Sequence, residues 1–257
     1  MSLLTRIQAL AEEHQAEWVG IRRHLHAHPE LSFEEHQTMA FVSATLSSWG
    51  VDHQTHVTGT GIVAHVRGKK PESRTVALRA DMDALPITEA NAVDYASTNP
   101  GVMHACGHDV HTTSLLGALR ILQLTSDGWS GTVRCIFQPG EECIPGGAKG
   151  MVAAGVLKNP EPVGIFGQHV FPDIPAGDVR VRGGAYMASA DEIHLTVKGQ
   201  GGHAALPHKC RDAVLAAPSL AGRAAPCHQD YPGRPPESAP WRPIRGSKNS
   251  RARGRTS

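Results

Sequence analysis

The chain has 257 residues, of which 40% are hydrophobic, 19% charged and 5% aromatic, and its formal net charge is +1. This length suffices for one large domain or two smaller ones, and it excludes a short disulfide scaffold. No apolar run approaches the roughly 20 residues of a membrane helix. Glu12, Glu13 and Glu17 interrupt the apolar positions of the N-terminal segment, which is wrong for a signal peptide. We therefore expect a soluble, cytoplasmic protein with no membrane partner.

Cysteine and histidine usage points to metal chemistry rather than to disulfides. The five cysteines are odd in number and lie in unlike contexts, which argues against a disulfide framework. The sixteen histidines are many for a chain of this length. Because histidine is the commonest metal ligand and a frequent general base, this count favours a metal site.

The first 50 residues predict helices. Leu3, Ile7 and Leu10 repeat at helical spacing, Pro29 ends the second segment, and residues 33–49 form another helical pattern that Gly50 ends.

Strands then alternate with helices. Strands are predicted at 51–57, 62–66, 75–79, 132–137 and 164–170, and helices at 111–124 and about 147–157. A hairpin-like turn at 58–61 joins the first two strands. This alternation predicts an α/β fold with a largely parallel sheet flanked by helices. A further strand at 192–198 and a helix starting near His208 indicate the start of a second domain.

Residues 218–257 differ in composition from the rest. Their net charge is +6, whereas residues 1–217 carry −5, and they contain seven prolines with little periodic apolar pattern. Such a segment buries too little surface to offset its ordering entropy, so we expect it to be disordered. A basic arm for nucleic acid or membrane is an alternative. Because its basic residues follow no regular spacing, we favour a solvated tail that binds no nucleic acid.

Acidic residues follow the strand at 75–79. Ligands of open α/β sheets bind at the carboxyl ends of the strands. Asp81 and Asp83 lie there, two residues apart, and would face the same side if the strand continued. A turn with capping aspartates is the alternative.

A dense cluster precedes the helix at 111–124. It comprises His104, Cys106, His108, Asp109 and His111. Cys106 and His108 can converge on one ion, and thiolate, imidazole and carboxylate together suit zinc, or manganese where oxygen ligands dominate. Packing in the core is the alternative, which the density of the cluster disfavours. Asp109 is expected to orient an imidazole or to cap the helix.

Two later strands also end in polar residues. Strand 132–137 leads to Glu141 and Glu142, which cannot both point the same way, so one can bind metal while the other acts as a general base. An isolated acidic pair would suggest only an acidic loop, but this pair follows a strand end where other candidate ligands converge. Strand 164–170 ends near His169. His203, after Gly201 and Gly202, can donate to a developing oxyanion, but the residues alone favour a plain turn with an incidental histidine.

Eight motifs, in this order along the chain, resemble those of the metal-dependent aminoacylase and hippurate hydrolase family of amidohydrolases. They are RRHLHAHPELSFEE (22–35), TGTGIVA (58–64), ALRADMDALPI (77–87), MHACGHDVHTT (103–113), FQPGEE (137–142), GGAKGM (146–151), GQHV (167–170) and GQGGHAALPHKCRDAV (199–214). The resemblance implies hydrolysis of N-acyl amino acids. It also implies a catalytic domain at 1–185 and the beginning of a lid and dimerisation domain at 186–217. Composition separates the tail at 218–257 from both.

The same resemblance implies roles for individual residues. Two divalent cations, Mn²⁺ or Zn²⁺, would polarise the amide carbonyl and activate a water, with Glu141 as its general base. Asp83 would support a metal ligand, and His203 would stabilise the tetrahedral intermediate, reaching into the partner subunit of a homodimer. The implied metal ligands are Cys106, His108, Glu142 and His169.

The C-terminal segment departs from the family pattern. Family members complete the lid, return to the catalytic domain and supply a final histidine ligand, whereas this sequence continues into the basic, proline-rich residues 218–257. Two hypotheses follow. The protein is an active amidohydrolase, or it is a truncated, inactive pseudoenzyme that keeps a partial metal site. The acyl group and the amino acid that it would act on are not readable from these residues.

Overall fold

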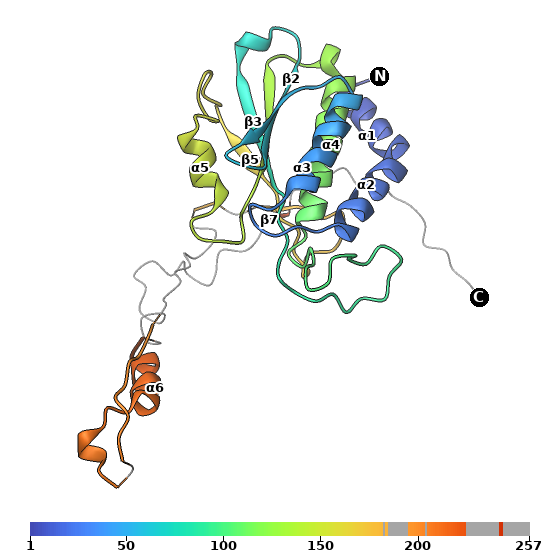
Figure 1. The fold of residues 1–257 in the computed structure, drawn as a ribbon. Helices are drawn as coiled ribbons and strands as arrows, with labels where there is room; N and C mark the ends of the chain where they lie inside the picture. The colour runs from blue at the N-terminus through green and yellow to red at the C-terminus, as the bar shows by residue number, and fades with distance from the viewer. Residues whose placement is uncertain (182, 185–194, 204, 225–241, 244–257) are drawn as a thin grey trace. The chain divides into compact units, whose positions relative to one another are not determined.

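The structure is a computed structural model that describes residues 1–181, 183–184, 195–203, 205–224 and 242–243 (Figure 1). It divides into two units, Met1–Pro172 and Asp173–Ser257, and each is described by itself. The predicted boundaries at 185/186 and 217/218 stay predictions.

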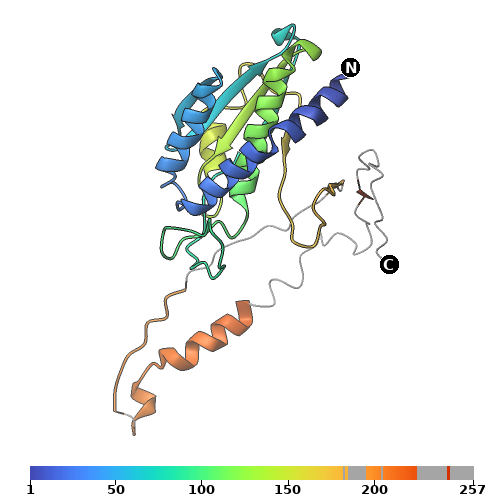
Figure 2. The same cartoon turned by 90° about the vertical axis from the view of Figure 1, so that its right-hand side faces the viewer.

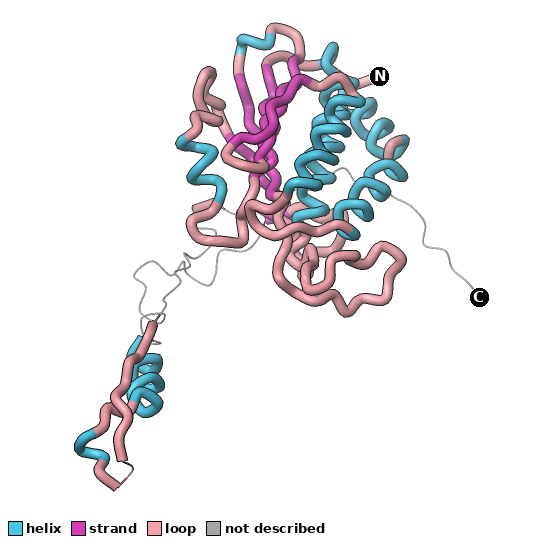
Figure 3. The backbone as a smooth tube through the Cα atoms, viewed as in Figure 1, coloured by secondary structure: helices cyan, strands magenta, loops and turns pink. Residues whose placement is uncertain are grey.

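The first unit is built on a five-stranded mixed sheet (Figure 3). Its strands are β1 (Asp52–Val57), β2 (Gly61–Arg67), β3 (Thr75–Asp81), β4 (Thr132–Gln138) and β5 (Ile165–Gly167), in the order β1-β2-β4-β3-β5. β3 pairs in parallel with β4 and β5, whereas β2 pairs antiparallel with β1 and β4. The predicted α/β fold is thus confirmed, with a tight hairpin adding two antiparallel strands to a parallel group.

Helices cover both faces of this sheet (Figures 1 and 2). One face carries α1 (Leu3–Glu13), α2 (Gln15–Ala27), α3 (His36–Ser48) and α4 (His108–Leu124), and the other carries α5 (Gly147–Ala153). Short 3₁₀ helices, η1 (Pro71–Ser73) and η2 (Ser126–Gly128), lie in the connections. None of the described helices combines the length and the apolar character that a membrane span requires.

Alternation along the strands divides the core into two clusters. In β2, Ile62 and Ala64 join the cluster under α2, α3 and α4, while Val63 between them joins the cluster on the α5 face. β4 behaves in the same way, with Phe137 on one side and Ile136 on the other. Because successive side chains of a strand point to opposite faces, a sheet covered on both sides needs near-continuous apolar strands.

Several element boundaries differ from the sequence predictions, and backbone conformation explains them. α3 begins at His36 rather than at 33, because Phe33 adopts a left-handed φ of 65°. α4 begins at His108, directly after Gly107 with φ 88°. α5 ends at Ala153, shortly before Gly155 with φ 81°. β5 is confined to three residues, so His169 lies just beyond the strand.

The second unit contains short elements. β6 (Arg180–Val181) pairs antiparallel with β7 (Arg242–Pro243), and η3 (Pro207–Lys209) precedes α6 (Ala213–Ala224). Asp212, directly before α6, caps its N-terminus, since its carboxylate accepts the amides of Val214 and Leu215.

Two expectations for this region are corrected. Residues 195–198 form no strand, while 192–194 lie outside the described residues. The expected disorder does not begin at Pro218, because this proline lies inside α6. Proline in a helix interior removes one hydrogen bond and its ring crowds the carbonyl four residues earlier, so here the helix-favouring alanine and leucine residues around Pro218 outweigh that cost. Most of 225–257 lies outside the described residues.

Leu116 provides a test of the core beneath α4. Leu116 is 0% exposed and Leu124 on the same helix is 37% exposed. We expect Leu116→Ala to lower the free energy of unfolding by about 2–5 kcal/mol, because it removes buried methyl groups and leaves a cavity. Leu124→Ala should change it by less than about 1 kcal/mol. Urea unfolding curves of the two variants measure the difference, and equal losses would contradict this packing.

Candidate metal centre

The parallel strands bring the sequence-predicted residues to one edge of the sheet. Because β4, β3 and β5 run parallel side by side, their carboxyl ends lie together. Asp81 is the last residue of β3, and the loops beyond the three strands carry the other acidic residues and one histidine. The N-terminus of α4 adds a cysteine and a second histidine. The predicted residues gathered in this way are Asp83, Cys106, His108, Glu141, Glu142 and His169.

His108 lies at the centre of this group. Its imidazole is fully buried, and its Nδ1 atom is 3.3 Å from Oδ1 of Asp83. Its Nε2 atom lies 3.8 Å from Glu141 and 3.7 Å from Oε1 of Glu142. Neither this Nε2 nor this Oε1 has a hydrogen-bond partner, although both are buried. Two unpartnered buried ligand atoms facing each other fit a metal cation between them.

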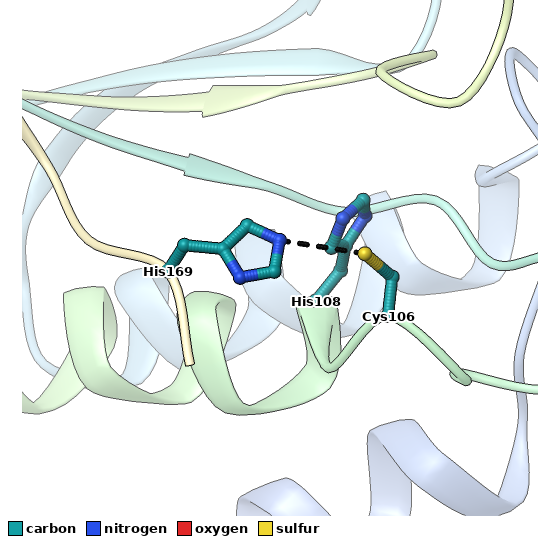
Figure 4. A group of neighbouring side chains, drawn as sticks. All are labelled: Cys106, His108 and His169. Carbon is teal, nitrogen blue, oxygen red and sulfur yellow. Dashed lines mark hydrogen bonds between the residues drawn. The ribbon is translucent and has the colours of Figure 1, made fainter. Parts of the chain in front are cut away.

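Cys106 and His169 extend the group. The Sγ atom of Cys106 is 3.4 Å from Nε2 of His169, and Figure 4 shows the two side chains pointing toward each other beside His108. The other ring nitrogen of His169, Nδ1, lies 2.6 Å from the carbonyl of Val170, so we assign the proton to Nδ1. Nε2 then has a free lone pair on the side of the thiol, as a ligand requires.

The charges at the centre call for a cation. Burial, together with the carboxylates of Glu142, Glu141 and Asp81, raises the pKa of the Cys106 thiol to about 12. Metal binding must therefore displace the thiol proton. Burial also raises the pKa of Glu141, with help from the neighbouring carboxylates of Asp81 and Glu142. A bound cation would offset this concentration of negative charge.

Asp83 supports the centre through contacts with His108 and with the backbone of Glu142. It accepts hydrogen bonds from Ser32 Oγ at 2.6 Å and from the backbone amide of Glu142 at 2.8 Å. Burial alone would raise the pKa of Asp83, but the hydrogen bonds from His108, Ser32 and the backbone outweigh it and hold the pKa well below its usual range. Asp83 therefore stays ionised, and it orients both His108 and the backbone of Glu142.

Glu35, for which the sequence predicted no role, anchors the loop before Glu141. Its carboxylate is fully buried and accepts the amide of Gly140 at 2.7 Å and the amide of Phe33 at 3.0 Å. The hydroxyl of Thr60 donates to its other oxygen. One side chain thus ties three segments together. Only its place in the 22–35 motif marked it in the sequence.

A second buried network holds the start of α4. Asp109 accepts from Nδ1 of His26 at 2.7 Å and from Nε of Arg22 at 3.0 Å. Nε2 of His26 lies 3.1 Å from Oε1 of Glu89. Asp109 thus orients an imidazole, as expected, but the imidazole belongs to α2. His104 is buried nearby with both ring nitrogens unpartnered, and burial chiefly lowers its pKa to about 4, so the ring is neutral.

His203 belongs to the second unit. Its side chain is exposed, and its Nδ1 atom accepts the amide of Ala205 at 3.2 Å. Because the structure places His203 only within its own unit, its predicted role stays a prediction.

Comparisons with known proteins fit this geometry. Residues 77–242 match the model of peptidase family M20/M25/M40, a range that extends into the predicted tail. The chain is 45% identical to an N-acyl-L-amino acid amidohydrolase of Geobacillus stearothermophilus, over 81% of this chain and 55% of the relative. It is 43% identical to the N-acetyl-L-cysteine deacetylase of Bacillus subtilis, over 79% of this chain and 48% of the relative.

Two solved structures share the fold. A putative aminohydrolase from methicillin-resistant Staphylococcus aureus is 36% identical, with a TM-score of 0.72, and the match covers 88% of this chain and 60% of that one. The Bacillus subtilis YXEP protein, described as a dinuclear metal-binding peptidase of the M20 family, is 39% identical, with a TM-score of 0.60. That match covers 64% of this chain and 45% of YXEP.

An α/β fold with candidate metal ligands at the carboxyl ends of its parallel strands defines the structural class. Within that class, the chain belongs to peptidase family M20/M25/M40. The relatives given above are named as an amidohydrolase and a deacetylase, which are hydrolytic enzymes. It spans about half the length of the curated relatives it matches.

Glu35 should control the order of the loop that carries Glu141. We expect Glu35→Ala to speed hydrogen exchange at the amide of Gly140, because each buried donor left without an acceptor costs about 1–3 kcal/mol. Glu35→Gln should stay close to the wild type, since its carbonyl accepts the two amides and its amino group can donate to Thr60. Hydrogen exchange followed by mass spectrometry measures both variants. Unchanged protection of this loop in Glu35→Ala would show that the anchor lies elsewhere.

Glu89 should make stability depend on pH. The backbone amide of Ser97, with help from His26 and Asn91, lowers the pKa of Glu89 from its ordinary 4.5 to about 2 in the folded protein. Its contribution to stability is therefore present above about pH 4.5 and is lost as the pH falls toward about 2. We expect Glu89→Gln to lose less stability than the wild type between about pH 6 and about pH 3, measured by urea unfolding.

The exposed Glu161 supplies the matched control for Glu89. Glu161→Gln should follow the wild-type curve. If Glu89→Gln and the wild type lose the same stability on acidification, the contacts of Glu89 with Ser97 and His26 do not stabilise its charged form.

Proposed function

We propose that this protein is a metal-dependent amidohydrolase that cleaves the amide bond of N-acyl amino acids. The observation that carries the proposal is the pair of buried, unpartnered atoms, Nε2 of His108 and Oε1 of Glu142, beside the Cys106 and His169 pair. The substrate class is supported by the names of relatives, which include an N-acyl-L-amino acid amidohydrolase and an N-acetyl-L-cysteine deacetylase.

The proposed ligands fit two divalent cations. Cys106, His108, Glu142 and His169 would hold them, and this mixture of thiolate, imidazole and carboxylate favours Zn²⁺ or Mn²⁺. When bound, the cations would polarise the scissile carbonyl and make the attacking water more acidic.

Glu141 is the proposed general base. Its side chain is 42% exposed, so it can reach a substrate, whereas that of Glu142 is 20% exposed. The pKa of Glu141 is raised toward neutral pH. A base with such a pKa can accept a proton from water and then deliver it to the leaving amine. Asp83 would keep His108 in its orientation throughout.

The second unit completes the proposal. We propose that it begins a lid that mediates homodimer formation, and that His203 donates to the oxyanion of the tetrahedral intermediate in the partner's site. An inactive pseudoenzyme with a partial metal site is the alternative, and the following experiment separates the two.

Hydrolysis assays test the proposed base. We expect the purified chain of residues 1–257 with added Mn²⁺ or Zn²⁺ to hydrolyse members of a panel of N-acetyl and N-benzoyl amino acids. Glu141→Gln should lower kcat by about 10²–10⁴-fold, because proton transfer to a positioned base contributes about that factor. Release of the free amino acid measures turnover.

Metal content and a surface variant serve as controls. Glu141→Gln should still bind metal, measured by atomic emission after dialysis, and Glu161→Gln should hydrolyse the substrates at the wild-type rate. Metal binding without turnover in the wild type would support the pseudoenzyme. Turnover that survives in Glu141→Gln would exclude Glu141 as the base.

A further inference from the structure

His111 lies beside the candidate metal centre, and both of its ring nitrogens are engaged. Its Nδ1 atom is 2.7 Å from Oδ1 of Asp81, and its Nε2 atom accepts the backbone amide of Val170 at 2.9 Å. The ring is 1% exposed. Val170 directly follows His169, so this chain of contacts connects β3 through α4 to the segment that carries a proposed ligand.

These contacts determine the tautomer of His111. The amide of Val170 can only donate, so Nε2 must carry the lone pair. A carboxylate can only accept, so Nδ1 must carry the proton and donate it to Asp81. Asp81 is in turn held by Arg79, whose Nη1 atom lies 2.6 Å from Oδ2, and Arg79 Nε donates to Gln138 at 2.9 Å. Each donor in this series faces an acceptor.

The side chain of Val170 makes a second contact with the start of α4. A Cβ atom placed on Gly107 would lie 2.5 Å from Cγ2 of Val170, so only glycine allows this close approach. The segment after β5 is therefore docked on α4 by one hydrogen bond and one apolar contact. Cys106, the neighbour of Gly107, faces His169 across this junction at 3.4 Å.

We propose that Asp81 and His111 form a positioning pair that holds His169 opposite Cys106. Asp81 fixes the His111 tautomer, His111 captures the amide of Val170, and this bond places the His169 ring. The inference rests on the proposed function, in which His169 is a metal ligand. Asp81, His108 and His111 are themselves close enough to surround an ion. A direct ligand role would require His111 to give up one of its two hydrogen bonds.

The tautomer is measured first, in the wild-type protein with ¹⁵N-labelled histidine. Long-range ¹H–¹⁵N spectra should show His111 protonated at Nδ1 and unprotonated at Nε2, without metal and after addition of Zn²⁺. An Nε2-protonated ring, or a Zn²⁺-dependent shift typical of a coordinated His111 nitrogen, would overturn the proposal. This measurement requires neither a variant nor an active enzyme.

Asp81→Asn tests the consequence for His169. Arg79 should hold the amide oxygen of the new side chain, so its amino group faces Nδ1 of His111 and the ring becomes protonated at Nε2. The Nε2–H group of His111 and the backbone N–H group of Val170 are then two donors that face each other. We expect faster hydrogen exchange at the Val170 amide and about 10–100-fold weaker Zn²⁺ binding by calorimetry, the loss typical of removing an outer-shell partner.

Asp52→Asn is the matched control, because Asp52 is an exposed aspartate on β1 that pairs with Arg67. It should leave the tautomer, Val170 exchange and Zn²⁺ affinity unchanged. Wild-type Val170 protection and Zn²⁺ affinity in Asp81→Asn would overturn the proposal. If the wild type binds no Zn²⁺, the proposed function fails, while the tautomer and Val170 exchange still decide whether the pair holds this segment.

Discussion

The burial of the His108 imidazole among carboxylates is the constraint on which the rest of the first unit depends. Asp83 engages its Nδ1 atom, while Nε2 faces Glu141 and Glu142 without a hydrogen-bond partner. Such a concentration of acidic groups around a buried imidazole is costly unless each one is hydrogen-bonded, paired, hydrated or bound to a cation. The parallel pairing of β3 with β4 and β5 is what brings these groups together.

Side chains that are not candidate ligands hold the segments that carry the ligands. Glu35 ties down the loop before Glu141, and Asp109 joins α4 to His26 of α2. His111 captures the amide of Val170. Each contact joins residues far apart in the chain, and each satisfies a buried polar group that would otherwise be unpaired. Precise placement of a metal site depends on such outer contacts as much as on the ligands.

Much of the fold was readable from local patterns. Apolar periodicity located the strands and most helices of the first unit, because buried strands and amphipathic helices impose their own spacing. The boundary at Phe33 was not readable, because a left-handed φ is uncommon for a residue other than glycine, whereas Gly107 and Gly155 adopt a left-handed φ that glycine permits. Of the strand expected at 192–198, the described residues 195–198 form no strand. Apolar and polar residues alternate there, but these residues pair with no second strand among the described residues.

The sequence by itself determined which residues have the chemistry of a metal centre. Cys106, His108, His169 and the pair Glu141 and Glu142 stand out because thiol, imidazole and carboxylate groups follow strand ends or precede a helix, and the family resemblance implies Glu142 as the ligand of that pair. Only the tertiary structure decided which atoms face one another: Asp81 hydrogen-bonds to His111, whereas Asp83 lies against Nδ1 of His108. The reason is physical: residue type sets what a group can bind, whereas hydrogen-bond partners distant in sequence set its orientation and its tautomer.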